Sequence, residues 1–259
     1  MVEGLKLLAQ KDGQVLEIAS GPVFVTGAAG GIGSQLVDEL LSAGHQVCAM
    51  DVNPDLLDKR CADWGRNVYP IAFDATDPDA TKDAVRAGVD RLGVPFGIVN
   101  IAGDNRIKPL TEISDAEWRY LIDVNLTSTF YMCREVLPLM AAERVGRVIN
   151  TSSIFGLRGQ VNDAAYCAAK AGVIGLTRAL AVEYAGRNIA VNSIAPVATL
   201  TERVAKLDPS HLDGQLQRIP MGRFSEVSDV TAAFHFLLSP GAAFFTGQVL
   251  SPNGGDWMP

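Results

Sequence analysis

The sequence predicts an α/β fold in which seven strands form one doubly wound, mostly parallel sheet with helices on both faces. Short apolar runs rich in β-branched residues alternate along the chain with longer segments of helical spacing. This alternation is typical of parallel strands joined by right-handed crossover helices. A glycine-rich turn separates the first apolar run from the first helical segment. A doubly wound sheet binds its ligand at such a turn.

The expected strands are short apolar runs, each bounded by polar or glycine-containing segments. In chain order they span Pro22–Thr26, Gln46–Met50, Val68–Ala72, Phe96–Asn100, Gly146–Thr151, Ile189–Ile194 and Gln248–Leu250. The expected helices carry apolar residues at intervals of three and four positions. They span Ile32–Ala43, a segment that begins near Pro54, Thr76–Leu92, Ser114–Arg144 with an internal break, Ala164–Ala185 and Ser225–Leu238.

Composition and charge narrow the domain organisation and the classes of partner. The chain has 259 residues, 48% of them hydrophobic, which is enough for one sizeable core. We expect one domain over residues 21–259, preceded by an N-terminal extension of residues 1–20. The formal net charge is −7 and no run of three Lys or Arg residues occurs, so neither nucleic acid nor an anionic membrane is an expected partner.

Metal binding and membrane insertion are not expected either. The four cysteines, Cys48, Cys61, Cys133 and Cys167, are scattered without a CxxC pair, and the three histidines are equally dispersed. This pattern fits reduced thiols and predicts no metal site. The first twenty residues lack a long apolar stretch, and no segment reaches the roughly 18 apolar residues of a membrane span. A cytoplasmic location is therefore expected.

The glycine-rich turn predicts a phosphate-binding loop. Gly27, Gly31 and Gly33 stand between a strand that ends at Thr26 and the following helix. Backbone N–H groups at a helix N-terminus attract a phosphate, and glycines let a pyrophosphate approach the backbone. No Lys follows the glycines, which excludes the phosphate loop of ATPases. Asp51 closes the second strand, where a carboxylate can accept hydrogen bonds from an adenosine ribose.

These residues resemble a known family. TGAAGGIG, residues 26–33, is similar to the TGxxxGxG loop of the short-chain dehydrogenases/reductases, and NIAG, residues 100–103, resembles their NNAG segment with Ile101 in place of the second Asn. The resemblance extends from Pro22 to Gly255 and implies a Rossmann fold. One departure is Val197, which stands where the family usually has Gly after Pro.

The resemblance also implies a catalytic tetrad of Asn125, Ser153, Tyr166 and Lys170, from the motifs DVNL, NTSSIFG and YCAAK. Tyr166 and Lys170 are four positions apart on an expected helix and therefore share one face. An adjacent ammonium favours the phenolate, which makes the tyrosine usable as a general base. Ser153 would hold the substrate oxygen, and the resemblance implies that Asn125 holds a water that relays protons. The hydride chemistry belongs to the cofactor.

The cofactor is expected to be NAD. Asp51 accepts from a ribose hydroxyl but repels the extra phosphate of NADP, and the loop offers no cation. Lys59 and Arg60 lie close enough in sequence to fold back, and Asp51 has the alternative role of capping the helix near Pro54. The expected cofactor site comprises Gly27, Gly31, Ile32, Gly33, Asp51, Asp74, Ala75, Asn100, Ala102, Gly103, Tyr166, Lys170, Pro196, Thr199 and Thr201.

The expected substrate is a secondary alcohol or a ketone. The candidate substrate contacts are Ser153, Ile154, Arg158, Gln160 and Tyr166. Arg158, Gln160 and Arg106 can grip an anionic or hydroxylated substrate, and the alternative for each is a solvated loop. A 3-oxoacyl thioester reductase is a second interpretation. A catalytically silent protein that binds a dinucleotide is a third.

The helix expected over Ala164–Ala185 predicts self-association. It is small or apolar around most of its circumference, so one sheet face cannot cover it. A second subunit is the expected cover, and the family's usual homotetramer or homodimer fits. Cys167, beside the expected base, has no His or acid placed in sequence to activate it. We therefore expect it to pack and not to act as a nucleophile.

Overall fold

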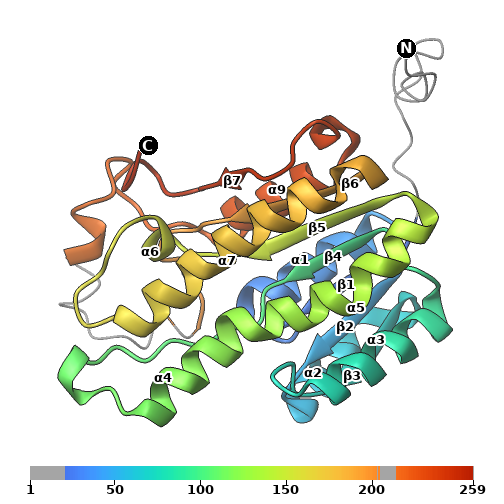
Figure 1. Cartoon of the computed structure of the whole chain (residues 1–259), viewed down its shortest axis with the longest axis horizontal. Coiled ribbons are helices and arrows are strands. Elements are labelled where there is room, and N and C mark those ends of the chain that lie inside the picture. The colour runs from blue at the N-terminus through green and yellow to red at the C-terminus, as the bar shows by residue number, and fades with distance from the viewer. Residues whose placement is uncertain (1–20, 203, 205–213, 259) are drawn as a thin grey trace.

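The chain folds, in a computed structural model, around one sheet of seven parallel strands (Figure 1). The structure describes residues 21–202, 204 and 214–258, so the expected extension of residues 1–20 lies outside the described residues. The strands are β1 (Val23–Thr26), β2 (Val47–Asp51), β3 (Val68–Ala72), β4 (Gly97–Asn100), β5 (Gly146–Thr151), β6 (Ile189–Ile194) and β7 (Val249–Leu250). Their order is β3-β2-β1-β4-β5-β6-β7, and every neighbouring pair is parallel. The predicted fold class is confirmed.

Helices cover both faces of this sheet. They are α1 (Gly31–Ser42), α2 (Pro54–Trp64), α3 (Pro78–Leu92), α4 (Asp115–Ile122), α5 (Ser128–Glu143), the short α6 (Ile154–Leu157), α7 (Ala164–Tyr184) and α9 (Val227–Leu238). Residues of α1, α2 and α9 share one buried cluster, and residues of α3, α5 and α7 share another. Figure 1 shows α5 and α7 running side by side across one face. The chain is doubly wound because the crossovers reverse direction between β1 and β4.

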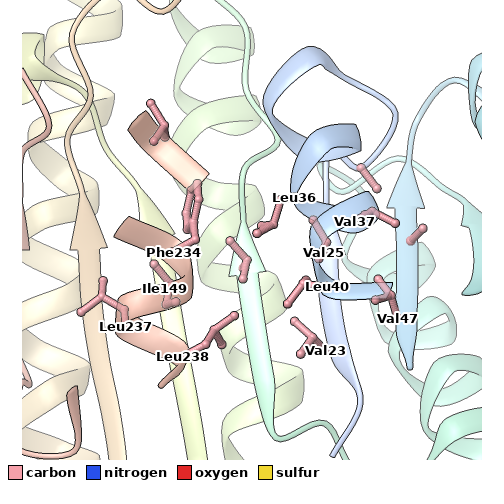
Figure 2. Close-up of a cluster of buried hydrophobic side chains, with 14 of the residues drawn as sticks. Val23, Val25, Leu36, Val37, Leu40, Val47, Ile149, Phe234, Leu237 and Leu238 are labelled. Carbon is pink, nitrogen blue, oxygen red and sulfur yellow. The ribbon is translucent and has the colours of Figure 1, made fainter. Parts of the chain in front are cut away.

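The period of two along each strand divides the core between the two faces. In β1, Val23 and Val25 belong to the cluster under α1 and α9, whereas Phe24 belongs to the opposite cluster. Figure 2 shows the first cluster, in which Leu36 of α1 and Phe234 of α9 lie on the same face of the sheet. The central strands are therefore buried on both sides, as a parallel sheet requires.

The helix boundaries follow local capping chemistry. α3 begins two positions after the expected Thr76, because the Asp77 side chain caps its first turn and Pro78 occupies the first helical position. The break expected within Ser114–Arg144 is a π-helical turn, Asp123–Thr127, between α4 and α5. Such turns occur frequently at functional sites. α6 was not expected from the sequence, because a single turn is too short to show a helical period.

One helix among the described residues is long and apolar enough to cross a membrane, by length and composition alone. The segment Ala164–Arg187 has a mean hydropathy of 1.3 over its most apolar window. The sequence expectation counted uninterrupted apolar residues, and the charged Lys170 and Arg178 interrupt this helix. In the fold, α7 packs against β6 and buries Val173 and Ile174. Of that apolar window, 39% is buried inside the single chain.

Candidate active site

Glycines shape the β1–α1 loop and the start of the helix that follows it. Gly27 has a φ of +66°, which favours glycine, and a Cβ on Gly33 would clash with the Gly27 carbonyl oxygen. α1 begins after Gly30 without a capping side-chain hydrogen bond, and its first turn contains no acidic residue. The first N–H groups of a helix have no partner within the helix. An uncapped, acid-free N-terminus fits the pyrophosphate of a dinucleotide.

Asp51 stands at the end of β2 against this loop. One carboxylate oxygen accepts a hydrogen bond from the Ala29 N–H and the other from the Asn53 N–H, each at 3.0 Å. The cap of α2 is Asn53, whose side chain accepts from the Leu56 N–H. The capping role considered for Asp51 is therefore filled by Asn53. Lys59, considered as a cation near the ribose, lies within α2.

Further expected cofactor residues lie at the end of β4 and in the segments that follow β3 and β4. The Thr26 hydroxyl accepts from the N–H groups of Ile101 and Ala102 and so joins β1 to the loop after β4. The buried Asn100 amide donates to the Asn150 side chain at 2.9 Å. Asp74 and Ala75 follow β3, and the Asp74 carboxylate accepts from the Thr76 N–H and hydroxyl. Asp74 therefore shapes its own turn.

A cavity of about 400 Å³ opens at the carboxyl ends of the central strands. Ten expected site residues line it: Ile32, Gly103, Asn125, Ser153, Ile154, Tyr166, Lys170, Pro196, Thr199 and Thr201. They come from α1, the loops after β4, β5 and β6, the π turn, α6 and α7. The fold thus brings the four expected catalytic side chains to one cavity.

Lys170 is fixed beside Tyr166. Its ammonium nitrogen lies 5.6 Å from the centroid of the Tyr166 ring and donates to the Thr151 carbonyl oxygen at 2.8 Å. The Ser152 hydroxyl donates to the Lys170 carbonyl oxygen at 2.8 Å, which ties α7 to the end of β5. Because Lys170 is only 3% exposed, its charge acts in a region poor in water. A fixed ammonium there favours the phenolate form of the neighbouring tyrosine.

Asn125 lies in the π turn and is fully buried. Its amide donates to the carbonyl oxygens of Asp104, at 2.7 Å, and Leu121, at 2.9 Å. These bonds leave its side-chain oxygen with no hydrogen-bond partner among the described residues. A Cβ on Gly103 would lie 2.6 Å from that oxygen and 3.3 Å from the Lys170 nitrogen. Gly103 therefore leaves the space in which Asn125 and Lys170 approach each other.

Ser153 lies where β5 passes into α6. It is the cap residue of α6, and its hydroxyl oxygen accepts from the Phe155 N–H at 3.2 Å. A hydroxyl that accepts one bond keeps its own proton to donate. The side chain is buried at 8% exposure and lines the cavity with Tyr166. Ser153 is thus oriented to donate toward an oxygen held in the cavity.

The polar substrate candidates are placed away from the cavity lining. The Arg158 guanidinium donates to the Asp256 carboxylate at 2.9 Å and, at 3.5 Å, to the Gln160 side chain. Arg106 lies over the Tyr120 ring, 4.3 Å from its centroid. None of Arg158, Gln160 and Arg106 is among the described residues that line the cavity. In this arrangement the three side chains are not part of the described cavity wall.

Val197 and Ile101, the two residues that depart from the family pattern, both contact apolar side chains near the cavity. Val197, where the family usually has Gly, is buried in a small apolar cluster with Ile154 and Ile219. Val197 also forms part of the cavity wall. Ile101, where the family has Asn, packs against the main core cluster and lines the cavity. Both changes make the surroundings of the cavity more apolar.

Several cavity residues were not singled out in the sequence. Thr151 contributes a main-chain oxygen, which no side-chain pattern can announce. Asp104, Asn105 and Gln215 line the cavity from loops and from the segment after the undescribed residues. Cys167, next to the expected base, is half-buried, and burial raises the pKa of its thiol. The thiol therefore stays protonated near neutral pH, consistent with a packing role.

Comparisons with known proteins agree with this geometry. Residues 27–256 match a family model described as enoyl-(acyl carrier protein) reductase. The chain is 35% identical over 235 residues to 3-oxoacyl-[acyl-carrier-protein] reductase FabG of Vibrio cholerae, covering 91% of this chain and 96% of that one. It is 37% identical over 241 residues to 2,3-dihydroxy-2,3-dihydro-p-cumate dehydrogenase of Pseudomonas putida, covering 90% and 93%. The crystal structure of levodione reductase superimposes with a TM-score of 0.87 at 29% identity, covering 91% and 97%.

Proposed function

The chain belongs to the short-chain dehydrogenase/reductase family, and on this premise we propose that it interconverts a secondary alcohol and a ketone with NAD as the hydride carrier. The observation that carries the proposal is the meeting of Asn125, Ser153, Tyr166 and Lys170 at one cavity. That cavity lies beside the uncapped N-terminus of α1. A bound nicotinamide dinucleotide supplies the hydride acceptor or donor.

In this proposal the protein's own residues move the proton and orient the substrate. Tyr166 accepts the hydroxyl proton in the oxidation direction, because the Lys170 ammonium beside it stabilises the phenolate. Ser153 donates to the substrate oxygen and holds the reacting carbon in position. Asn125, whose buried side-chain oxygen has no partner among the described residues, offers an acceptor for a water that links Lys170 to solvent.

The preference for NAD rests on Asp51. Its carboxylate lies against the glycine loop, and its two oxygens accept from Ala29 and Asn53. A phosphate on the adenosine ribose would approach this negative charge, whereas a ribose hydroxyl would donate to it. Among the described residues, no salt bridge pairs Asp51 with a cation. These observations support NAD over NADP.

The proposal is tested with a panel of secondary alcohols and ketones. Purified protein is mixed with NAD and each alcohol, or with NADH and each ketone, while the absorbance of the reduced nicotinamide is followed. Turnover of at least one matched pair supports the proposal. Binding of NAD without turnover across a broad panel would instead favour a silent dinucleotide-binding protein, against which the assembled tetrad argues.

Reduction of a 3-oxoacyl thioester is the second candidate. It is favoured by the similarity to the Vibrio cholerae reductase and by a solved 3-oxoacyl-[acyl-carrier protein] reductase from Brucella melitensis, with a TM-score of 0.86 at 32% identity. The same four residues serve this reaction, because it too reduces a ketone. Acetoacetyl-CoA in the panel separates the two: a kcat/KM above that of every simple ketone identifies the thioester.

We also propose that the protein is a homotetramer or homodimer located in the cytoplasm. α7 buries one face, including Ala169, Val173 and Thr177. Its other face remains exposed in the single chain, with Val182 at 85% exposure next to small residues. Association of two copies would cover this face. Light scattering at micromolar concentration tests the assembly, and a stable monomer would contradict it.

A further inference from the structure

The C-terminal segment that follows β7 carries one buried carboxylate, that of Asp256. Asn253 forms a turn in which its side-chain oxygen accepts from the Gly255 N–H at 2.8 Å and its amide donates to the Trp257 carbonyl oxygen at 2.9 Å. The Asp256 N–H donates to the Asn253 carbonyl oxygen at 3.1 Å. This turn fixes Asp256, whose side chain is only 2% exposed.

Two arginine side chains, Arg158 and Arg218, lie close to this carboxylate. One Asp256 oxygen lies 2.9 Å from the Arg158 guanidinium, which follows α6 directly. The other lies 3.6 Å from the Arg218 Nε, at the end of the segment after β6. A buried carboxylate needs such partners, because an unpaired charge in the interior is costly. Asp256 therefore joins the C-terminal segment to two segments that border the cavity.

The Arg158 guanidinium lies immediately behind the cavity wall. It is 5.1 Å from the centroid of the Phe155 ring, and Phe155 lines the cavity. Arg158 itself is not among the described lining residues. The charged residues that do line the cavity, among those described, are Asp104 and Lys170. Because Lys170 is bonded to Thr151 beside Tyr166, the described wall offers no free cation to a substrate anion.

We propose that Asp256 is a specificity-determining residue that withdraws Arg158 from the cavity and so restricts the enzyme to substrates whose part inside the cavity is uncharged. The inference rests on the proposed oxidoreductase function and adds the substrate class. Replacing Asp256 by Asn removes the ion pair, so the described partners that remain for the guanidinium are all neutral: the new amide oxygen, the Phe155 ring and the Gly159 and Gln160 oxygens. Arg158 then turns toward the cavity, where a carboxylate on the substrate pairs with it.

A matched pair of ketones tests this role. 4-Oxocyclohexanecarboxylate and its methyl ester share one ring and one ketone and differ in charge. The wild type is expected to reduce the ester with a kcat/KM at least tenfold above that of the acid. Asp256→Asn is expected to shrink this ratio mainly by lowering KM for the acid. The double variant Asp256→Asn/Arg158→Leu restores the preference for the ester, because it has no cation to release.

A binding measurement separates this inference from the proposed function. Calorimetry with 4-oxocyclohexanecarboxylate needs no turnover, and Asp256→Asn is expected to bind it at least tenfold more tightly than the wild type. Asp83→Asn, in the exposed Arg86–Asp83 pair on α3, changes the net charge equally and serves as the control. If every variant binds the probe as expected but no ketone is reduced, the proposed oxidoreductase function is contradicted. The inferred role of the Asp256–Arg158 pair in excluding anions is then still supported.

Two results would overturn the inference. One is a wild type that reduces the acid as well as the ester. The other is a folded Asp256→Asn variant whose ester-to-acid ratio and affinity for the acid match those of the wild type. Thermal melting checks the fold, and Asp256→Ser serves as a second, smaller replacement if the Asn variant does not melt cooperatively.

Discussion

The Lys170 ammonium lies 5.6 Å from the centroid of the Tyr166 ring and is anchored by the Thr151 carbonyl oxygen at 2.8 Å. The two side chains are one helical turn apart on α7, and the anchor comes from the end of β5. The charge that tunes the tyrosine is therefore positioned by the junction of a strand and a helix. Rigid elements hold such a constellation more closely than loops do.

Replacing Lys170 by Ala is expected to damage both turnover and cofactor affinity. The variant loses the ammonium that favours the phenolate, and general acid–base catalysis contributes roughly 10²-fold to 10⁴-fold. Steady-state kinetics and NAD titration measure the two effects. Lys82→Ala, at an exposed position of α3, is the control. A Lys170→Ala variant with unchanged NAD affinity would show that Lys170 does not contact the cofactor.

Gly103→Ala is expected to lower kcat by about tenfold or more, since small displacements of catalytic groups have large effects on rate. The new Cβ would lie 2.6 Å from the Asn125 oxygen and 3.3 Å from the Lys170 nitrogen, so one of these groups must move. Gly186→Ala is a matched control, because a Cβ there meets no atom within 4 Å. Equal kcat values for the two variants would show that the Asn125 and Lys170 positions tolerate displacement.

Asp51 is expected to set the choice of dinucleotide. The wild type should prefer NAD over NADP by at least about tenfold in kcat/KM, or about 1.4 kcal/mol. Asp51→Ala should shrink this ratio mainly by improving the reaction with NADP. The change also removes the bond to the Ala29 N–H, so the ratio is the informative quantity and not either rate alone. Asp55→Ala, in the first turn of α2, controls for net charge. A wild type that prefers NADP would contradict the assignment.

The capping box of α4 predicts an acid-sensitive contribution to stability. Hydrogen bonds from the Lys108 ammonium and from Ser114 hold the pKa of Glu117 at about 2, below its ordinary value of 4.5. A carboxyl whose pKa is lowered by folding stabilises the fold above its unfolded pKa. This contribution is therefore complete above pH 4.5 and is lost as the pH falls toward 2.

Glu117→Gln removes that titration. Urea unfolding midpoints measured downward from neutral pH should fall less steeply for the variant than for the wild type across this acidic range. Arg134 and Glu135 form a surface pair on α5, and Glu135→Gln controls for the loss of one carboxylate elsewhere. Parallel curves for wild type and Glu117→Gln would mean that the α4 cap does not couple to global unfolding.

The features that were predicted from the sequence are local. Each strand is a short apolar run that can be recognised within five or six residues of sequence. The sheet formed by these strands has the predicted architecture. The spacing of Tyr166 and Lys170 places them on one helix face wherever that helix lies. The glycine loop depends on its immediate neighbours, β1 and α1. For such features, short-range chemistry decides the structure.

The features that were missed depend on contacts between distant segments. Arg158 looked available to a substrate, but it pairs with Asp256, 98 positions away. Val197 was recognised only as a departure from the family pattern, and its packing in a cluster with Ile219 was not predicted. Neither partner is marked by a spacing or motif. Such contacts arise only when the crossovers bring loops together at the carboxyl edge of the sheet.

Tyr166→Phe tests the central claim most directly, because it removes the phenolic hydroxyl and leaves the ring. The wild type and the variant are compared with NAD and the best alcohol of the panel, under conditions in which hydride transfer limits the rate, and NAD affinity is titrated separately. We predict that turnover falls by several orders of magnitude while NAD affinity stays nearly unchanged. A variant that keeps a tenth of the wild-type turnover would contradict the assignment of Tyr166 as the general acid and base.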